Sequence, residues 1–193
     1  MSAVMTEIRW HARAGQGAVT AAKLLAEAAL TEGKYIQAMP EYGPERMGAP
    51  LKAFTRLSEE PIEVSNNIEF PDIIVVLDDT LLPVVDVAEG LAADGAVVVN
   101  TPASPESVRA QLGLPATVKV GTVDASAIAL ETIKRDLPNT PIVGALARVC
   151  PVVELDSIVT QLESTFGKKF SQAIIDANLD SVRRAYEEVT ISE

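Results

Sequence analysis

The stretch Ile8-Arg9-Trp10-His11-Ala12-Arg13-Ala14-Gly15-Gln16-Gly17-Ala18 governs the fold expected for this chain. Its first four residues are typical of a short strand, and the next six are typical of a turn. The segment 18–32 is rich in Ala, Leu, Lys and Glu and predicts a helix that ends at Gly33. Residues 35–39 predict a second strand. A strand, a helix and a strand in this order are expected to form a right-handed unit with parallel strands.

Strands and helices alternate along most of the remaining chain. We expect strands over 51–57, 62–64, 72–77, 95–100 and 117–123, and helices over 81–93, 125–135, 139–146, 155–166 and 171–188. The run 72–77 is almost continuously apolar, as in strands buried on both faces. The pattern predicts an α/β fold, a three-layer α/β/α sandwich with a mostly parallel sheet and a helical C-terminal part. Because no linker or repeat interrupts the pattern, residues 1–193 are predicted to form a single domain.

Composition restricts the partners of this chain. Its 16 Lys and Arg residues face 27 Asp and Glu residues, which gives a net charge of -11. An acidic surface speaks against nucleic acid, whose phosphates need a basic face. No apolar stretch approaches the about 20 residues that a membrane span requires. The first residues also lack the basic and apolar regions of a signal peptide. We therefore expect a cytoplasmic protein without membrane or nucleic-acid partners.

The chain has one cysteine, Cys150, and one histidine, His11. This pair cannot build a metal cluster, and no Cys/His or Ser/His/Asp set is apparent, so we predict neither catalytic nor metal-binding residues. Cys150 is expected to be a small buried hydrophobic residue. His11 either faces a ligand or belongs to the core, and its place before the glycine loop favours the ligand. Asp78-Asp79 follows a buried strand, where capping a helix is a commoner role than binding a metal.

The glycine loop Arg13-Ala14-Gly15-Gln16-Gly17 is the first candidate site. It places backbone amides at the start of a helix, where these donors and the helix dipole suit a phosphate. Arg13 adds a cation for a charge-assisted contact. The spacing lacks the third glycine of dinucleotide-binding loops and the Gly-Lys-Ser/Thr of P-loops, which gives little support to NAD. The alternative is a tight turn that needs only the backbone freedom of glycine.

The loop over 39–50 is the second candidate site. It follows the second predicted strand, so we expect it beside the glycine loop, at the sheet edge where open α/β folds bind ligands. Arg46 suits a phosphate or a carboxylate, and Tyr42 can stack on a flat ring. The alternative is an interface loop, in which Glu45 pairs with Arg46 or a neighbour and Tyr42 is buried against another subunit. The two interpretations are compatible.

Several separated segments resemble one family in the same order along the chain. Residues 11–23 are similar to the Gly-Arg-Gly-Gly-Gln-Gly opening of gamma subunits of pyruvate and related 2-oxoacid:ferredoxin oxidoreductases. The second loop, Tyr42-Gly43-Pro44-Glu45-Arg46-Met47-Gly48-Ala49-Pro50, resembles the second signature of that family. Further similar segments lie at 54–56, 60–62, 71–72, 77–82, 139–146 and 166–169.

The resemblance implies a multi-subunit enzyme that decarboxylates a 2-oxoacid on thiamine diphosphate. Electrons pass through [4Fe-4S] clusters to ferredoxin, and the acyl group passes to coenzyme A as co-substrate. Thiamine diphosphate, Mg²⁺ and the clusters are implied to lie on alpha, beta and delta-type subunits, with none of them bound by this chain alone. Within the coenzyme A site, Arg13, Gly15, Gln16 and Gly17 would face the phosphates. The second loop, with Tyr42, Glu45 and Arg46, would line the neighbouring wall or the subunit interface.

The chain departs from the family pattern in both loops. Ala12 and Ala14 stand where glycine is frequent, and Met47 stands where a second arginine is usual. The loss of one cation makes the gamma subunit of the related oxalate oxidoreductase, which needs no coenzyme A, an alternative. The continuation Ala49-Pro50 resembles the pyruvate type, which is the favoured expectation. The sequence is also compatible with a stand-alone nucleotide-binding module and with a purely structural subunit.

Overall fold

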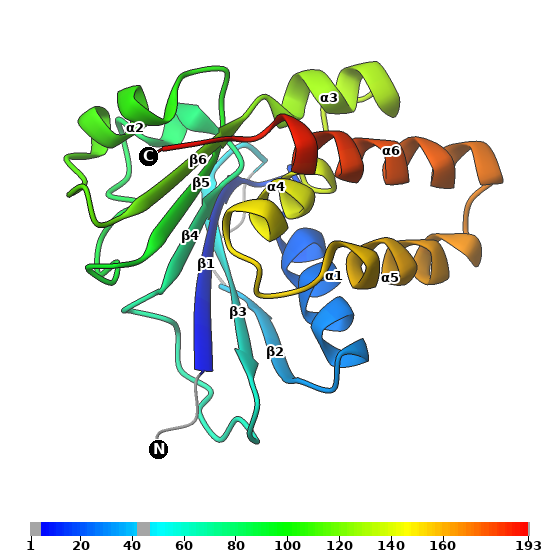
Figure 1. The fold of residues 1–193 in the computed structure, drawn as a ribbon, viewed down its shortest axis with the longest axis horizontal. Coiled ribbons are helices and arrows are strands. Elements are labelled where there is room, and N and C mark those ends of the chain that lie inside the picture. The colour runs from blue at the N-terminus through cyan, green and yellow to red at the C-terminus, as the bar shows by residue number, and fades with distance from the viewer. Residues whose placement is uncertain (1–4, 42–46, 193) are drawn as a thin grey trace.

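A computed structural model describes residues 5–41 and 47–192, and its centre is a seven-stranded mixed sheet (Figure 1). The strands lie in the order β2-β3-β1-β4-β5-β6-β7. Their bounds are β1 Met5–Arg13, β2 Tyr35–Pro40, β3 Pro50–Ser58, β4 Ile73–Val76, β5 Ala96–Asn100, β6 Lys119–Val123 and β7 Thr190–Ile191. Strands β1, β4, β5 and β6 are parallel, whereas β3 is antiparallel to β1 and β7 is antiparallel to β6.

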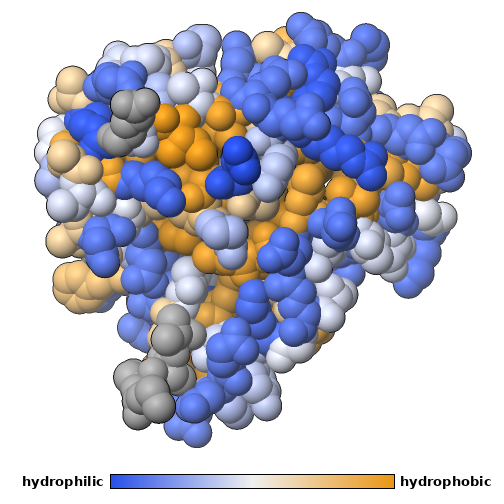
Figure 2. Space-filling view, in the orientation of Figure 1, coloured by the Kyte–Doolittle hydropathy of each residue, from blue (hydrophilic) through white to orange (hydrophobic). Residues whose placement is uncertain are grey.

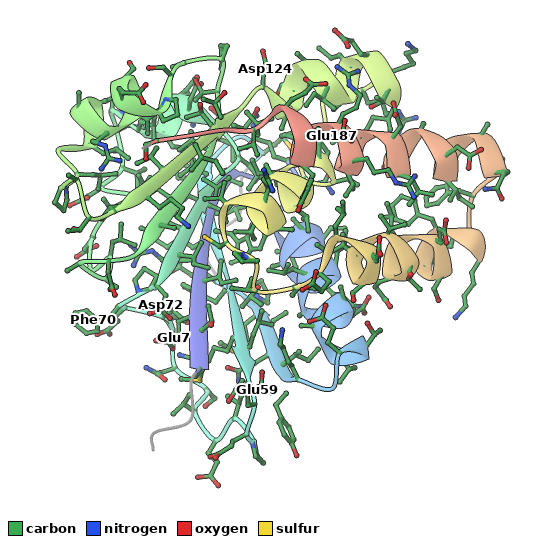
Figure 3. All side chains as sticks on the ribbon, in the orientation of Figure 1. Glu7, Glu59, Phe70, Asp72, Asp124 and Glu187 are labelled. Atoms are coloured by element: carbon green, nitrogen blue, oxygen red, sulfur yellow. The ribbon has the colours of Figure 1, made fainter. Side chains whose placement is uncertain are left out.

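The two strands on either side of the first helix run in the same direction, as expected, but they are not neighbours. Strand β3 lies between β1 and β2 and pairs antiparallel with each of them. Its register sets Arg13 opposite Pro50, so the end of β1 and the start of β3 lie side by side at one end of the sheet. At the opposite end of the sheet, the Glu7 amide donates a 2.7 Å hydrogen bond to Asp72 before β4, and Figure 3 shows these two residues close together.

Helices cover one face of the sheet. They are α1 Ala18–Thr31, α3 Ala125–Thr132, α4 Pro141–Val149, α5 Leu155–Gly167 and α6 Gln172–Glu188. The core beneath them combines apolar side chains of the sheet, such as Trp10 and Val98, with the inner faces of these helices. Hydrophilic outer surfaces of α5 and α6 flank an apolar strip between the two helices (Figure 2). Gly144 lets α4 approach α6, because a β-carbon there would lie 2.1 Å from the Val182 carbonyl oxygen.

A thinner layer covers the other face. It consists of the 3-10 turn η1 Asp79–Leu81, the irregular segment that follows it, and helix α2 Pro105–Leu112. Leu81, Val87 and Val108 pack there on Val76 and Val99 of the sheet. The three-layer α/β/α architecture with a mostly parallel central sheet is therefore confirmed, and the C-terminal helices pack over the sheet. Within the described residues, no helix is both long and apolar enough to cross a membrane.

The predicted helix over 81–93 is wrong. Only η1 forms, followed by turns, and a buried arginine explains why. The guanidinium group of Arg9, whose residue is 3% exposed, donates to the backbone carbonyls of Val87 and Glu89. These carbonyls accept hydrogen bonds from a buried cation of the sheet. They therefore do not accept the hydrogen bonds that a helix over this segment would need.

Three smaller differences concern short elements. The predicted strand over 62–64 is irregular chain, and its Val64 carbonyl accepts a hydrogen bond from the Gln37 side chain. Helix α2 was missed, although Ser104 caps its start and Gly113 ends it in the left-handed conformation. Strand β7 was missed because two residues at the chain end carry no periodic signal.

Candidate functional site

The candidate site lies at the carboxyl ends of β1 and β4. The chain leaves β1 through the glycine loop and enters α1 on one face of the sheet, but it leaves β4 towards η1 on the other face. Two neighbouring parallel strands whose connections diverge in this way form a topological switch point, the usual ligand crevice of open α/β sheets. The first candidate loop of the sequence therefore lies where this fold class binds ligands.

Two glycines give the first loop its shape. Gly15 has φ +104° and Gly17 has φ +81°, which are conformations that side-chain-bearing residues rarely adopt. Gly17 is the N-cap of α1, and within the described residues no side chain donates or accepts a capping hydrogen bond there. The first backbone amides of a helix lack intrahelical partners. Together with the helix dipole they make this end of α1 suitable for an anion.

Polar side chains connect the loop to the end of β4. The Gln16 side-chain amide accepts a 2.7 Å hydrogen bond from the Arg13 backbone amide and donates another of 2.7 Å to the Asp78 carboxylate. The Arg13 guanidinium lies 3.4 Å from Asp78 and donates to the Thr80 hydroxyl at 2.8 and 3.0 Å. Both predicted polar residues of the loop therefore bridge the crevice, and Gln16 contributes its side chain to the shape of the loop.

Asp78 carries the opposing charge of the site. Burial by itself would raise the pKa of this carboxyl, but hydrogen bonds from Thr80 and Gln16 and the charge of Arg13 outweigh it, so the pKa lies below its ordinary value. Asp78 is therefore ionised at neutral pH and partly balances the Arg13 cation. It also caps η1, because its side chain accepts a hydrogen bond from the Thr80 amide, as expected for a residue that starts a helical turn.

The second loop returns beside the first, as the sequence predicts. The Ala14 amide donates to the Ala49 carbonyl at 2.9 Å, and the Gly48 amide donates to the Ala14 carbonyl at 3.1 Å. The Met47 sulfur lies 2.8 Å from the position that a β-carbon on Gly15 would take. Met47 is 89% exposed, so an apolar thioether and not a cation borders the glycine loop at this position. Tyr42, Glu45 and Arg46 lie outside the described residues.

Sequence reasoning assigned no site role to three residues that contact the glycine loop. Asp78 and Thr80 reach it from the end of β4, and Asn139 packs on Gly17 from the segment before α4. The available signal was position: Asp78 ends a buried strand, and Asn139 begins a segment similar to the family. Neither signal states which residue it will contact, because these contacts join distant parts of the chain.

The single histidine belongs to the core. His11 is 2% exposed, and its Nε2 accepts a 3.1 Å hydrogen bond from the Arg9 guanidinium, so the expectation that it faces a ligand is wrong. Burial and the charges of Arg9 and Lys52 lower its pKa to about 3. Cys150, expected to be buried, is half-buried and packs against the core, and burial raises the pKa of its thiol to about 11. The described residues contain no cluster of three His, Cys, Asp or Glu side chains placed to hold a metal ion.

Comparison with known proteins identifies relatives that match almost the whole chain. The family model for pyruvate ferredoxin/flavodoxin oxidoreductase matches residues 7–188. Pyruvate synthase subunit PorC of Thermotoga maritima is 54% identical over 97% of this chain and 96% of its own length. The pyruvate/ketoisovalerate oxidoreductases common subunit gamma of Pyrococcus abyssi is 47% identical over 98% of this chain and 100% of its own.

A solved structure shares the fold closely. The crystal structure of pyruvate oxidoreductase subunit PORC from Thermotoga maritima superposes with a TM-score of 0.86 and 49% sequence identity. The superposition covers 98% of this chain and 99% of that chain. The resemblance seen in the separated sequence segments is thus confirmed along almost the whole length. This chain belongs to the pyruvate ferredoxin/flavodoxin oxidoreductase family, as a gamma-type subunit of a multi-subunit oxidoreductase.

Proposed function

We propose that this chain serves a pyruvate:ferredoxin oxidoreductase, in which it contributes part of the coenzyme A site and of the subunit interface, with residues 1–193 acting as one domain. The names of its close relatives support pyruvate as the 2-oxoacid. In this proposal, oxidative decarboxylation depends on thiamine diphosphate, and the acyl group passes to coenzyme A. The complex works in the cytoplasm and passes electrons to ferredoxin.

The switch point between β1 and β4 is the observation that carries the coenzyme A assignment. Coenzyme A contains a diphosphate, and the uncapped start of α1 offers backbone donors to such a group. Gly15 and Gly17 add no side chains of their own beside these donors and adopt the left-handed backbone that the loop requires. The Arg13 side chain, 31% exposed, adds a cation at the mouth of the crevice. Gln16 shapes the loop, and Tyr42, Glu45 and Arg46 come from the adjoining second loop.

The remaining chemistry is assigned to the partner subunits. A [4Fe-4S] cluster takes four cysteine thiolates, and this chain has a single cysteine. We therefore assign the clusters to the alpha, beta and delta-type subunits, and the family resemblance implies the same for thiamine diphosphate and Mg²⁺. The role of this chain is to bind and orient the acyl acceptor and to complete the assembly.

Steady-state kinetics of the assembled enzyme test the coenzyme A site. We expect Arg13→Ala to raise the KM for coenzyme A about tenfold, the loss of one charge-assisted contact of about 1.4 kcal/mol, with the KM for pyruvate unchanged. Arg183→Ala, an exposed arginine on α6, is the matched control. An unchanged KM for coenzyme A in the Arg13 variant would contradict the coenzyme A site and favour a purely structural role for the chain.

One observation favours a second candidate function. Met47, not an arginine, borders Gly15, so the crevice has one cation fewer than is usual in the family resemblance. An oxalate oxidoreductase, which needs no coenzyme A, fits that feature. Assay of the purified complex with pyruvate, 2-oxoisovalerate, 2-oxoglutarate and oxalate, each with and without coenzyme A, separates the two. Turnover of oxalate alone, independent of coenzyme A, would replace the first proposal.

A further inference from the structure

Three adjoining hollows lie over α1, α5 and α6, and Asp78 lines none of them. The first, of about 240 Å³, lies between α1 and β2 and includes Ile36 and Met39. The second, of about 530 Å³, lies between α1, α5 and the start of α4 and includes Leu24 and Lys168. The third, of about 360 Å³, lies between α5, α6 and the segment after α3. We name their combined lining the α1–α5 surface.

The hollows form one continuous surface because neighbours share residues. The first and second share Val19 and Lys23, and the second and third share Asn139 and Phe166. The surface therefore extends from β2 across α1 to the start of α6. A protein partner can contact all three hollows at once, because its interface residues come from a broad patch of its surface.

Large apolar side chains stand exposed on this surface. Val19 is 43% exposed, Phe170 is 46% exposed and Ile174 is 45% exposed. The rings of Phe166 and Phe170 lie 5.1 Å apart and are tilted by 57°, so they form a firm aromatic corner between the second and third hollows. Grouped apolar side chains at the rim of hollows are characteristic of protein–protein contact sites.

Cations surround these apolar side chains, although the chain as a whole carries a net charge of -11. Lys23, Arg135, Lys168 and Lys169 line the hollows. Among the described lining residues Glu27 is the carboxylate, and it lies 3.5 Å from Lys23. Within the described part of the chain, the other three cations have no carboxylate within 4.0 Å. The surface is thus positively charged on an acidic subunit, which complements a partner that presents carboxylates.

We propose that the α1–α5 surface binds another subunit of the same oxidoreductase, through a segment that presents apolar side chains between carboxylates. The apolar side chains enter the hollows, and the carboxylates meet Arg135, Lys168 and Lys169. The proposal rests on the gamma-type subunit assignment, and the α1–α5 surface adjoins the glycine loop through Asn139, which packs on Gly17. Its variants leave Arg13 and the glycine loop intact, so failure of one proposal is distinguishable from failure of the other.

Lysine acetylation of the unaltered protein is the first test. The purified complex and the isolated chain are treated with the same acylating reagent, and each lysine is quantified by mass spectrometry. We expect Lys168 and Lys169 to react at least tenfold more slowly in the complex, with Lys119 on β6 as the internal reference. Equal reactivity of these two lysines in the complex and in the isolated chain would overturn the proposal.

Charge reversal is the second test. We expect Lys168→Glu with Lys169→Glu to weaken association with the partner subunits at least tenfold in 50 mM salt, and less in 500 mM salt because ions screen exposed charges. Arg183→Glu, on the outer face of α6, is the matched control and should assemble normally. Circular dichroism verifies that each variant is folded. Unchanged association of the folded double variant would overturn the proposal. The proposal would also fail if coenzyme A or pyrophosphate alone protected Lys168 and Lys169 of the isolated chain from acetylation as strongly as the complex does.

Discussion

The side-chain amide of Asn139 packs directly on the α-carbon of Gly17, so that Nδ2 lies 2.8 Å from the position that a β-carbon would take. The Asn139 Cγ and Cβ atoms lie 2.9 and 3.1 Å from the same point. This contact joins the start of α1 to the segment before α4. Glycine is therefore required at this position for two reasons, the left-handed backbone and the close approach of the Asn139 side chain.

Replacement of Gly17 and of Gly33 by alanine separates the cost of backbone strain from the cost of the contact with Asn139. We expect Gly17→Ala to lower the free energy of unfolding by about 2–4 kcal/mol, measured by urea denaturation, through backbone strain and the steric contact with Asn139. Gly33→Ala is the matched control, because Gly33 has φ +85° but no atom within 4 Å of the new β-carbon. Its cost of about 1–2 kcal/mol measures strain alone. Equal costs in the two variants would show that Asn139 yields without penalty.

The Gln16 amide offers a test of the polar bridge. Gln16→Glu places a carboxylate where the amide now donates to Asp78 at 2.7 Å. We expect a loss of about 1–3 kcal/mol in unfolding free energy at pH 7, because two like charges meet in a half-buried crevice. The loss should shrink at pH 4.5, where one carboxyl of the pair takes up a proton. Gln16→Ala, which lacks the charge, should show no such pH dependence, and a pH-independent loss in both variants would contradict the bridge.

His11 makes stability depend on pH. Burial lowers its folded-state pKa to about 3 from an ordinary value of 6.5, so the unfolded chain binds the proton more readily between these values. The contribution is fully present above pH 6.5 and is lost as the pH falls towards 3, by at most about 1.4 kcal/mol per pH unit. Unfolding free energies from urea titrations at pH 7, 6 and 5 measure this slope. In His11→Gln, which retains an acceptor for Arg9, the slope should be smaller, and an identical slope would exclude His11 as its source.

Arg56 and Glu7 stabilise the pairing of β1 with β3. The Arg56 side chain is 1% exposed and donates to Glu7 at 2.7 Å and to the Gln37 side chain at 2.8 Å. We expect Glu7→Ala to destabilise the chain by about 2–4 kcal/mol, because it leaves a buried cation with fewer partners. Glu7→Gln keeps an acceptor oxygen and should cost less. Thermal and urea denaturation compare the two, and an alanine variant as stable as the glutamine variant would contradict this role.

The sequence predicted those helices and strands that are determined by the residues within them. The buried strands and the C-terminal helices follow from apolar runs and helical spacing, and Arg13, Gly15, Gln16 and Gly17 follow from a strand that meets a helix through glycine. The 81–93 segment has helical composition, but Arg9 from a distant strand takes its carbonyls. The insertion of β3 between β1 and β2 was likewise hidden, because pairing partners in a sheet are not encoded in the periodicity of either strand.

In the candidate site, too, the features set by local sequence were predicted and those set by tertiary contacts were not. Its backbone shape was readable from the two glycines, whereas the charge balance was not, because Asp78 approaches Arg13 only after the sheet has formed. Asn139 is a further example, since no property of that position in the chain identifies Gly17 as its neighbour. Residues joined by tertiary structure need the fold before their partners can be named.

The antiparallel pairing of β2 with β3 has a consequence for how such subunits diverge. The loop between Pro40 and Pro50 joins neighbouring strands whose register runs from Tyr35 opposite Ser58 to Pro40 opposite Ala53. This register is set by the strand residues themselves, so exchanges of residues in the loop leave the pairing of β2 with β3 in place. Under the proposed function, a change of acyl acceptor would need changes in one short connection only, while the sheet that carries it is inherited unchanged.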